Sequence, residues 1–565
     1  MSLLAAALLS ASAGEFAKGI VRNPSPPVRC HCPPALRVRC GVGAAGCRLR
    51  GAGCGVRGGG CGLRAAGTLQ LRSPGSPHLT ACCRRSQLGW RSWNYFQCNI
   101  NQEIMQAQMD ALALARHGTS LLKLGYENVV RRSASLCVRW LLADGALRCC
   151  WQGLDDCWQS CTGSGGSFHD PTTGQPLINT TLFPSLGGMV EHGHNIGVKV
   201  GFYQDNCRCH ECKDRETCWG QDTHYAQDAN LTESLKFDGL KVDSCGNQRD
   251  MTQWAAEFAK PGNHDLMVES CGNGPEGTSP KKAEYTGADY LGLAPTWKAM
   301  LEDTCPFSFY RVSVDVAPQF LSTVFNLNRA LPYLRPEAPL SRPGCWACAS
   351  PPPPPPPRVL LCLSRRSCAL CLTVRCCCVA ADPDMLETGV APMTYTESQT
   401  HFAMWAVTSA PLILGFDLHD SEVVEANWKI IANEEVLNVS QTYAGHPGYL
   451  VKNSSEYFVG DVKHGCTATR GENQSLPEYQ VWAKPQPGGK LAVLVVNIGV
   501  SAGLTVTLPL AELYHEGLFT EGAPAKVQIR DLWKHTEVHP GTEWTELVVE
   551  DVAQHDGMFV LLTPA

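Results

Sequence analysis

The pattern of apolar and polar residues divides the chain into two parts, the first of which alternates strand-like runs with amphipathic helical stretches. Helical periodicity is clearest over Glu103–His117 and Pro184–Asn195. The apolar runs around these stretches end in polar residues and cover 88–94, 197–203, 239–243, 266–270, 310–316 and 411–416. Near-continuous apolar strands that alternate with helices are typical of a parallel sheet, and this many units favour an α/β fold of the (β/α)8 TIM barrel type.

After about Val439 the pattern changes to short strands separated by turn residues. The expected strands are Lys490–Asn497, Leu504–Leu508, Val527–Trp533, Glu546–Glu550 and Gly557–Thr563. These runs predict an antiparallel β-sandwich as a separate domain. We therefore expect a catalytic barrel over residues 88–438 and a β-sandwich over residues 439–565.

Three segments differ in composition from the rest of the 565 residues. Residues 28–87, 130–152 and 348–381 together hold 18 of the 30 cysteines and 18 arginines, but only one acidic residue. The remainder is acidic and has an ordinary globular composition. Linkers or disordered insertions are one explanation for these segments, and their positions in the predicted barrel suggest another, given below.

The start of the chain predicts export. Residues 1–13 contain a short apolar stretch and an Ala-x-Ala cleavage pattern, which we interpret as a signal peptide. Five Asn-x-Ser/Thr triplets fit a secreted or lysosomal/vacuolar glycoprotein. No apolar run approaches the length of a membrane span, and a net charge of −6 gives no nucleic-acid footprint. We therefore expect neither a membrane nor a nucleic acid as a partner, and the sequence does not specify an oligomeric state.

The most informative chemistry lies in the run Lys241-Val-Asp-Ser-Cys245, which follows an apolar strand. This spacing puts the carboxylate of Asp243 at a strand tip, on the same face as the ammonium of Lys241. A carboxylate kept ionised by a neighbouring cation on a rigid strand is what a glycosidase nucleophile requires. Asp238 also follows Lys-x, but it lies at the start of the same strand.

Five ordered motifs resemble those of the melibiase-type α-galactosidases, glycoside hydrolase family 27. They are Gly89-Trp-Arg-Ser-Trp-Asn94, Leu154-Asp-Asp-Cys-Trp158, Lys241-Val-Asp-Ser-Cys245, Arg311-Val-Ser-Val-Asp315 and Asp382-Pro-Asp-Met-Leu386. The stretch 401–415 also resembles the final barrel segment of that family, and the similarity extends from Leu88 to Ala565 apart from two interruptions. The resemblance implies a retaining hydrolase that releases terminal α-D-galactose from oligosaccharides or glycoconjugates, without a cofactor or a metal.

The resemblance also implies residue roles. Asp243 would be the nucleophile and Asp315 the acid/base, with the pKa of Asp315 above that of Asp243. Asp155 and Asp156 would accept hydrogen bonds from the 4- and 6-hydroxyls of galactose, and Trp93 would pack on the sugar ring. The full set of implied substrate-binding residues is Trp93, Asp155, Asp156, Tyr203, Lys241, Glu269, Arg311 and Asp384.

The same resemblance implies disulfides. Cys98 would pair with Cys157, Cys271 with Cys305, and Cys245 with one of Cys207, Cys209, Cys212 or Cys218. The cluster Cys207-Arg-Cys-His-Glu-Cys212 could also be read as a metal site, but in a secreted chain we prefer disulfides.

One motif departs from the family. Many members carry Cys-Glu-Trp after the fifth strand, where the sugar 2-substituent is recognised, whereas this chain reads Glu269-Ser-Cys271. Specificity at the 2-position is therefore open, and α-N-acetylgalactosaminidase or β-L-arabinopyranosidase activity remains an alternative. A further alternative, from a different class, is a non-catalytic sugar-binding protein or the misfolded product of an unspliced transcript.

We hypothesise that the three unusual segments are translated introns. Without residues 130–152, Gly125–Val129 would run directly into Gly153-Leu-Asp-Asp, as in the resembling enzymes, and the other two segments interrupt family motifs in the same way. Sequencing of the transcript tests this hypothesis. We expect the main species to lack all three segments, and a continuous cDNA that contains them would refute the idea.

Overall fold

The computed structural model describes residues 88–126, 150–163, 166–204, 209, 224–244, 248–260, 266–272, 308–336, 380–468 and 470–565. The predicted signal peptide and the segment 28–87 lie outside these ranges, as do most of the segments 130–152 and 348–381.

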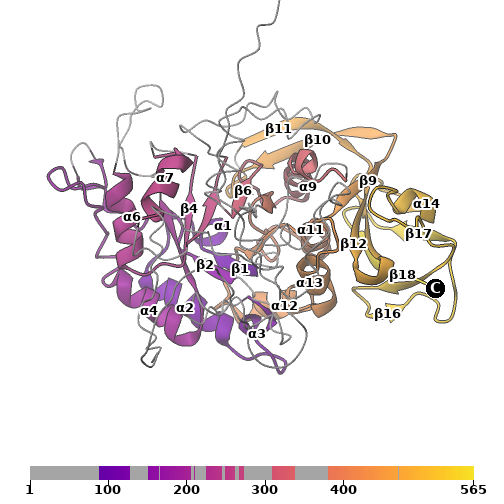
Figure 1. Cartoon of the computed structure of the whole chain (residues 1–565), viewed down its shortest axis with the longest axis horizontal. Helices are drawn as coiled ribbons and strands as arrows, with labels where there is room; N and C mark the ends of the chain where they lie inside the picture. Colours follow the sequence, from indigo (N-terminus) through magenta and orange to yellow (C-terminus); the bar gives the residue numbers. More distant parts are fainter. Residues whose placement is uncertain are drawn as a thin grey trace, which may run out of the picture. The chain divides into compact units, whose positions relative to one another are not determined.

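The first part of the described chain forms an eight-stranded parallel sheet in the order β7-β6-β5-β4-β3-β2-β1-β8 (Figure 1). Its strands are β1 (Leu88–Arg91), β2 (Cys150–Gly153), β3 (Val200–Gln204), β4 (Gly239–Val242), β5 (Met267–Ser270), β6 (Phe309–Arg311), β7 (Ala380–Asp382) and β8 (Leu412–Leu414). Leu386 N–H, just after β7, donates to the carbonyl of Ile413 in β8 at 2.8 Å. The two outer strands are thereby neighbours, and the predicted (β/α)8 barrel is confirmed.

Helices follow most of the described strands and surround the sheet (Figure 1). The longer ones are α2 (Gln102–Ala113), α4 (Leu186–Ile196), α6 (Tyr225–Ser234), α7 (Met251–Phe258), α9 (Phe320–Arg329), α11 (Tyr395–Val407), α12 (Ser421–Ile431) and α13 (Glu434–Gln441), and the short ones are α1 (Trp93–Phe96) and α3 (Leu121–Leu124). Side-chain caps begin several of them, as where Ser185 Oγ accepts from Gly188 N–H at the start of α4. None of the described helices is long and apolar enough to cross a bilayer.

Two strand predictions need correction. The apolar run 310–316 predicts a strand up to Val316, but β6 ends at Arg311, because Val312 N–H bonds to the carbonyl of Asp382 and the chain then leaves the ladder. The backbone of β2 begins at Cys150, so its first three residues belong to the segment that we interpret as an insertion. These residues pair in register with β1, from Leu88 opposite Cys150 to Arg91 opposite Gly153.

The second part of the chain is antiparallel, as predicted, and forms a β-sandwich. A six-stranded sheet has the order β16-β15-β18-β13-β12-β9, and a two-stranded sheet pairs β14 with β17. The strands are β9 (Tyr449–Asn453), β12 (Tyr479–Gln486), β13 (Lys490–Asn497), β14 (Leu504–Pro509), β15 (Val527–Asp531), β16 (Thr536–Glu537), β17 (Glu546–Val552) and β18 (Gly557–Pro564), with the short helix α14 (Leu510–Leu513) after β14.

The central strand β13 is apolar on both faces, which explains its continuous hydrophobic run. Leu491, Val493 and Val495 belong to the core of the sandwich. Ala492, Leu494 and Val496 belong instead to the core that includes the barrel. Helix α11 packs against this face of the sheet and is buried on nearly all sides from Ser398 to Val407, where the continuous apolar run begins at Phe402.

Candidate active site

Polar side chains gather at the carboxyl ends of the barrel strands, where active sites of such barrels lie. Tyr203 on β3 is directly opposite Lys241 on β4, and Lys241 is opposite Glu269 on β5. Side chains at paired positions of parallel strands point to the same face. These three predicted residues are therefore neighbours, and all three are buried.

Arg91, at the end of β1, forms a buried ion pair with Glu269 on β5. Its two terminal nitrogens bind both carboxylate oxygens of Glu269, with Nη1 to Oε1 at 2.9 Å, and its Nε lies 3.7 Å from Asp155 Oδ2. Gly153, opposite Arg91 in β2, makes room for it, because a Cβ there would lie 3.1 Å from Nε. Glu269 was expected to bind substrate, but here it is the counter-ion of Arg91.

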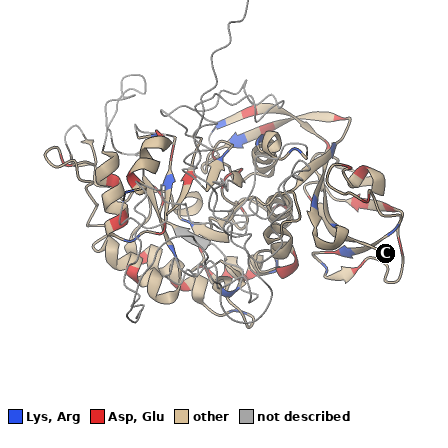
Figure 2. Cartoon of the chain, viewed as in Figure 1, with Lys and Arg blue, Asp and Glu red and all other residues tan. Residues whose placement is uncertain are grey.

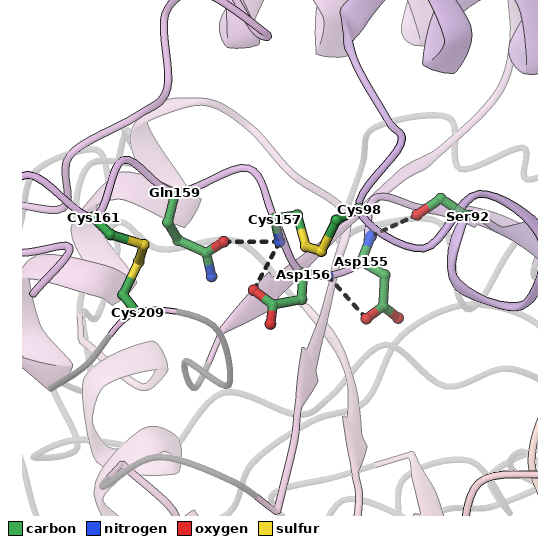
Figure 3. Close-up of a disulfide and its surroundings, with 8 residues drawn as sticks. All are labelled: Ser92, Cys98, Asp155, Asp156, Cys157, Gln159, Cys161 and Cys209. Atoms are coloured by element: carbon green, nitrogen blue, oxygen red, sulfur yellow. Dashed lines mark hydrogen bonds between the residues drawn. A yellow bond between two sulfur atoms is a disulfide. The ribbon is translucent and has the colours of Figure 1, made fainter. Parts of the chain in front are cut away.

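The adjacent aspartates after β2, Asp155 and Asp156, are held by several hydrogen bonds (Figure 3). Lys241 Nζ donates to Asp155 Oδ2 at 2.8 Å, and Asp155 N–H donates to Ser92 Oγ. Asp156 Oδ1 accepts from Cys157 N–H at 2.7 Å. Both carboxyls are nearly inaccessible to solvent, so their positions are fixed before a ligand arrives.

Asp243, just beyond β4, lies among donors and cations. Tyr203 Oη donates to Asp243 Oδ2 at 3.2 Å, and Ser244 N–H donates to Oδ1 at 2.6 Å. Burial alone would raise the pKa of Asp243, but the charges of Lys241 and Arg311, with these hydrogen bonds, hold it below its ordinary value. Asp243 is thus an ionised carboxylate, and it remains partly exposed.

The pKa of Asp156 is shifted in the opposite direction, upward. Burial, together with the nearby charges of Asp155 and Asp243, raises the pKa of Asp156 to about 6. The pKa of Asp156 is therefore raised while that of nearby Asp243 is lowered, and such opposite shifts are common at functional sites.

Arg311 connects the predicted acid/base to the rest of the site. Its Nη2 donates to Asp315 Oδ1 at 2.5 Å, and its Nη1 lies 3.6 Å from Asp384 Oδ1. The Asp315 side chain is 51% exposed, whereas that of Arg311 is 8% exposed. Since the charge of Arg311 also acts on Asp243, one guanidinium serves both predicted catalytic carboxyls.

Asp384 adopts a backbone conformation that is rare for an aspartate, with φ +91. Its Oδ2 accepts from Val316 N–H at 2.8 Å and its Oδ1 from Met385 N–H at 2.8 Å. The bond from Val316 connects the loop after β7 to the loop that carries Asp315. Asp384 therefore orders the loop of Asp315 as well as facing Arg311.

Two buried acids of the site were not predicted. Asp382, at the end of β7, accepts from Asp384 N–H at 2.9 Å, and burial with the charges of Glu269 and Asp384 raises its pKa. Glu387 is buried and accepts from Asn94 Nδ2 at 3.0 Å, and burial also raises its pKa. Asp382 belongs to the same Asp-Pro-Asp motif as Asp384, and nothing in the neighbouring sequence indicated that Asp382 is also part of the site.

Trp93, the first residue of α1, is half-buried and packs on the apolar interior of the barrel. The predicted site residues Tyr203, Lys241, Asp243, Asp155, Asp156, Glu269, Arg311, Asp315 and Asp384 are joined to one another by the contacts and charges described above. The carboxyl ends of β2 to β7 thus supply one continuous site.

The disulfide predictions have mixed outcomes. The Cys98–Cys157 bridge is confirmed (Figure 3). Cys271 carries a free buried thiol, which lies 3.7 Å from Glu269 Oε1, so the predicted pairing with Cys305 is wrong for this structure. Cys305 and Cys245 are outside the described residues.

Cys209 is bonded to Cys161, a pairing that the sequence did not indicate, and it is therefore not the partner of Cys245 (Figure 3).

Comparisons with known proteins agree with this architecture. Residues 477–562 match the family model of the alpha galactosidase C-terminal beta sandwich domain. Alpha-galactosidase 2 of Arabidopsis thaliana is 25% identical over 457 residues, which cover 80% of this chain and 83% of the relative.

Solved structures share the fold. The crystal structure of alpha-galactosidase I from Mortierella vinacea has a TM-score of 0.55 at 16% identity, and the match covers 86% of this chain and 99% of that one. An alpha-galactosidase from Saccharomyces cerevisiae, solved with raffinose, has a TM-score of 0.53 at 17% identity, over 85% of this chain and 98% of that one.

The Arg91–Glu269 pair can be tested by a double-mutant cycle. Arg91→Met leaves the buried Glu269 carboxylate without its counter-ion, so we expect the free energy of unfolding to fall by about 3–5 kcal/mol. The double variant Arg91→Met/Glu269→Met removes both charges and is expected to be more stable than Arg91→Met alone. Denaturant unfolding measures both effects.

The partly exposed pair Arg530–Glu435 provides the control. Arg530→Met should cost less than about 1 kcal/mol, because solvent screens that pair. Additive losses in the Arg91/Glu269 double variant would contradict the assignment.

The raised pKa of Asp156 predicts a pH dependence of stability. Because the folded-state pKa is about 6 and the ordinary value is 3.8, the folded protein binds more protons than the unfolded chain between these values. The resulting stabilisation is complete below about pH 4 and is lost as the pH rises through about 6, by up to about 3 kcal/mol. Asp156→Asn should therefore lose less stability than the wild type between pH 4 and 7 in thermal unfolding.

Asp170 is the control, because hydrogen bonds from Thr173 and Thr172 lower its pKa. Because that pKa lies below 3.8, Asp170→Asn should leave the profile between pH 4 and 7 close to that of the wild type. Parallel profiles of wild type and Asp156→Asn would contradict a raised pKa.

Proposed function

We propose that the chain is a melibiase-type α-galactosidase of glycoside hydrolase family 27, which releases terminal non-reducing α-D-galactose from α-galactosides. The matched sandwich domain, the similar relatives and the shared fold support this proposal. The observation that carries this proposal is the environment of Asp243, an ionised carboxylate at a strand end between Tyr203, Lys241 and Arg311. Such a group can attack an anomeric carbon.

The reaction would proceed by double displacement with retention of configuration. Asp243 attacks the anomeric carbon while the bond to the leaving oxygen breaks, and Asp315 gives its proton to that oxygen. Asp315 then takes a proton from water, which attacks the galactosyl ester of Asp243 and releases galactose. The half exposure of the Asp315 side chain supports this role, because solvent has to reach it in the second step.

The remaining polar groups would bind the sugar. Asp155 and Asp156 would accept from the 4- and 6-hydroxyls, and a glucoside would lose the bond from the 4-hydroxyl because that group points the other way. Trp93 would cover the apolar face of the ring. Glu269, bound by both terminal nitrogens of Arg91, would act on substrate only through the residues that Arg91 orders.

The setting of this activity would be the secretory pathway, with galactosidic oligosaccharides or glycoconjugates as substrates. Two disulfides among the described residues, Cys98–Cys157 and Cys161–Cys209, support an oxidising compartment.

Hydrolysis of a chromogenic α-galactoside tests the proposal. We expect Asp243→Asn to lower kcat by about 10⁴-fold or more, because no covalent intermediate can form. Asp238→Asn is the matched control, since Asp238 lies at the opposite end of β4 and bonds to His194 and Val200 N–H. Its activity per folded molecule should stay near that of the wild type.

Other outcomes select the alternatives. Faster turnover of an α-N-acetylgalactosaminide or a β-L-arabinopyranoside than of the galactoside would favour those activities. If the wild type binds galactose but hydrolyses none of these substrates, and Asp243→Asn binds equally well, the chain is a sugar-binding protein and the proposal fails.

A further inference from the structure

A two-stranded hairpin connects β9 to β12, two neighbouring strands of the six-stranded sandwich sheet. Its strands β10 (Tyr457–His464) and β11 (Arg470–Pro477) pair with each other over eight residues and belong to neither sheet of the sandwich (Figure 1). The family-model match begins at residue 477, where β11 ends. The hairpin is therefore a separate element whose position has to be explained by other contacts.

Those contacts are with the barrel. The side-chain amide of Gln319, at the N-cap of α9, donates from Nε2 to the carbonyl of Asp461 at 2.8 Å and accepts at Oε1 from Lys463 N–H at 2.8 Å. One amide thus satisfies a donor and an acceptor of β10, as a residue of a neighbouring strand would. Gly460 allows the close approach, because a Cβ there would lie 2.8 Å from Leu321 Cδ1.

The tip of the hairpin reaches the predicted acid/base. Gly465 N–H donates to the backbone carbonyl of Asp315 at 2.9 Å. The Cys466 thiol is partly exposed, and burial together with the charges of Asp315 and Glu387 raises its pKa to about 11. Cys466 at the hairpin tip is therefore close enough to Asp315 and Glu387 for their charges to act on its thiol.

We infer that the hairpin tip, residues 465–468, forms the wall of the active site on the leaving-group side and that Gln319 positions it. The inference rests on the proposed role of Asp315, because an acid/base lies beside the glycosidic oxygen and groups bonded to its loop face the departing alcohol.

The chemistry of the hairpin indicates the class of leaving group. The tip offers a thiol at Cys466, a hydroxyl at Thr467 and backbone groups, which suit sugar hydroxyls. Both basic and acidic residues occur along the hairpin (Figure 2). Lys463 pairs with Asp461, His464 lies 3.2 Å from Glu472, and Arg470 is exposed at the start of β11. The hydroxyl, thiol and backbone groups of the tip suit a saccharide, so we expect a galactoside linked to another sugar to contact this wall.

Two substrates with similarly poor leaving groups but different sizes test this inference: raffinose and methyl α-D-galactoside. In Gln319→Ala we expect kcat/KM for raffinose to fall about tenfold, while the value for the methyl galactoside stays within about twofold. Gln319→Glu keeps the acceptor for Lys463 N–H but puts a carboxylate oxygen against the Asp461 carbonyl, so it should lose at least as much on raffinose as Gln319→Ala. Gln474→Ala, on β11 of the same hairpin, should change neither substrate by more than about twofold.

A second variant leaves the Gln319 contacts intact. Cys466→Phe adds bulk at the tip and should raise KM for raffinose without changing the methyl galactoside, whereas Cys466→Ser should change little. Equal losses on raffinose and the methyl galactoside in Gln319→Ala would mean that the hairpin only supports Asp315. Unchanged raffinose turnover in both Gln319→Ala and Cys466→Phe would mean that the hairpin does not contact the leaving group. Either result overturns the inference while wild-type turnover of the chromogenic galactoside leaves the proposed function standing.

Discussion

The site depends on four charged side chains that pair with each other away from the surface: Arg91, Asp155, Lys241 and Glu269 are each at most 4% exposed. A buried charge without a partner is costly, so each of these groups fixes the position of the next. Because they come from four different strand ends, the pairing also fixes how those strands lie relative to each other at the catalytic edge. Lys241 of this set, together with Arg311, keeps the pKa of Asp243 below its ordinary value.

The fold was predictable where the pattern of residues is local. The continuous run of β13 indicated a strand, and its two apolar faces require two cores, which the sandwich and the barrel supply. The place of Asp243 at a strand end was predictable because it follows an apolar run within an ordered motif, whereas Asp315 lies in the loop after β6, inside the run that was predicted to be a strand. The surroundings of both residues were not predictable, because the partner of a strand-end side chain depends on which strand lies opposite. Arg91 is the clearest case, since its sequence neighbours give no hint of Glu269.

The same reasoning explains the errors. The run 310–316 is apolar enough for a strand, but the ladder ends at Arg311, where the chain begins a loop held by Asp384. Cysteine pairing follows distance in the fold, so neither the Cys161–Cys209 bridge nor the free thiol of Cys271 could be deduced from spacing. Gln319 was overlooked because its two bonds are to backbone atoms of a hairpin more than 140 residues away.

The strand β2 shows why a site can persist beside an unusual segment. Its ladder to β1 consists of backbone hydrogen bonds, which nearly any residue can make, and residues 150–152 make them here. The features that the site needs begin only at Gly153, which admits Arg91, and continue with Asp155 and Asp156. If residues 130–152 were absent, the run Gly125–Val129 would precede Gly153 and could fill the same ladder positions. The chemistry is therefore specified by residues after the junction, and either version of the chain can present it.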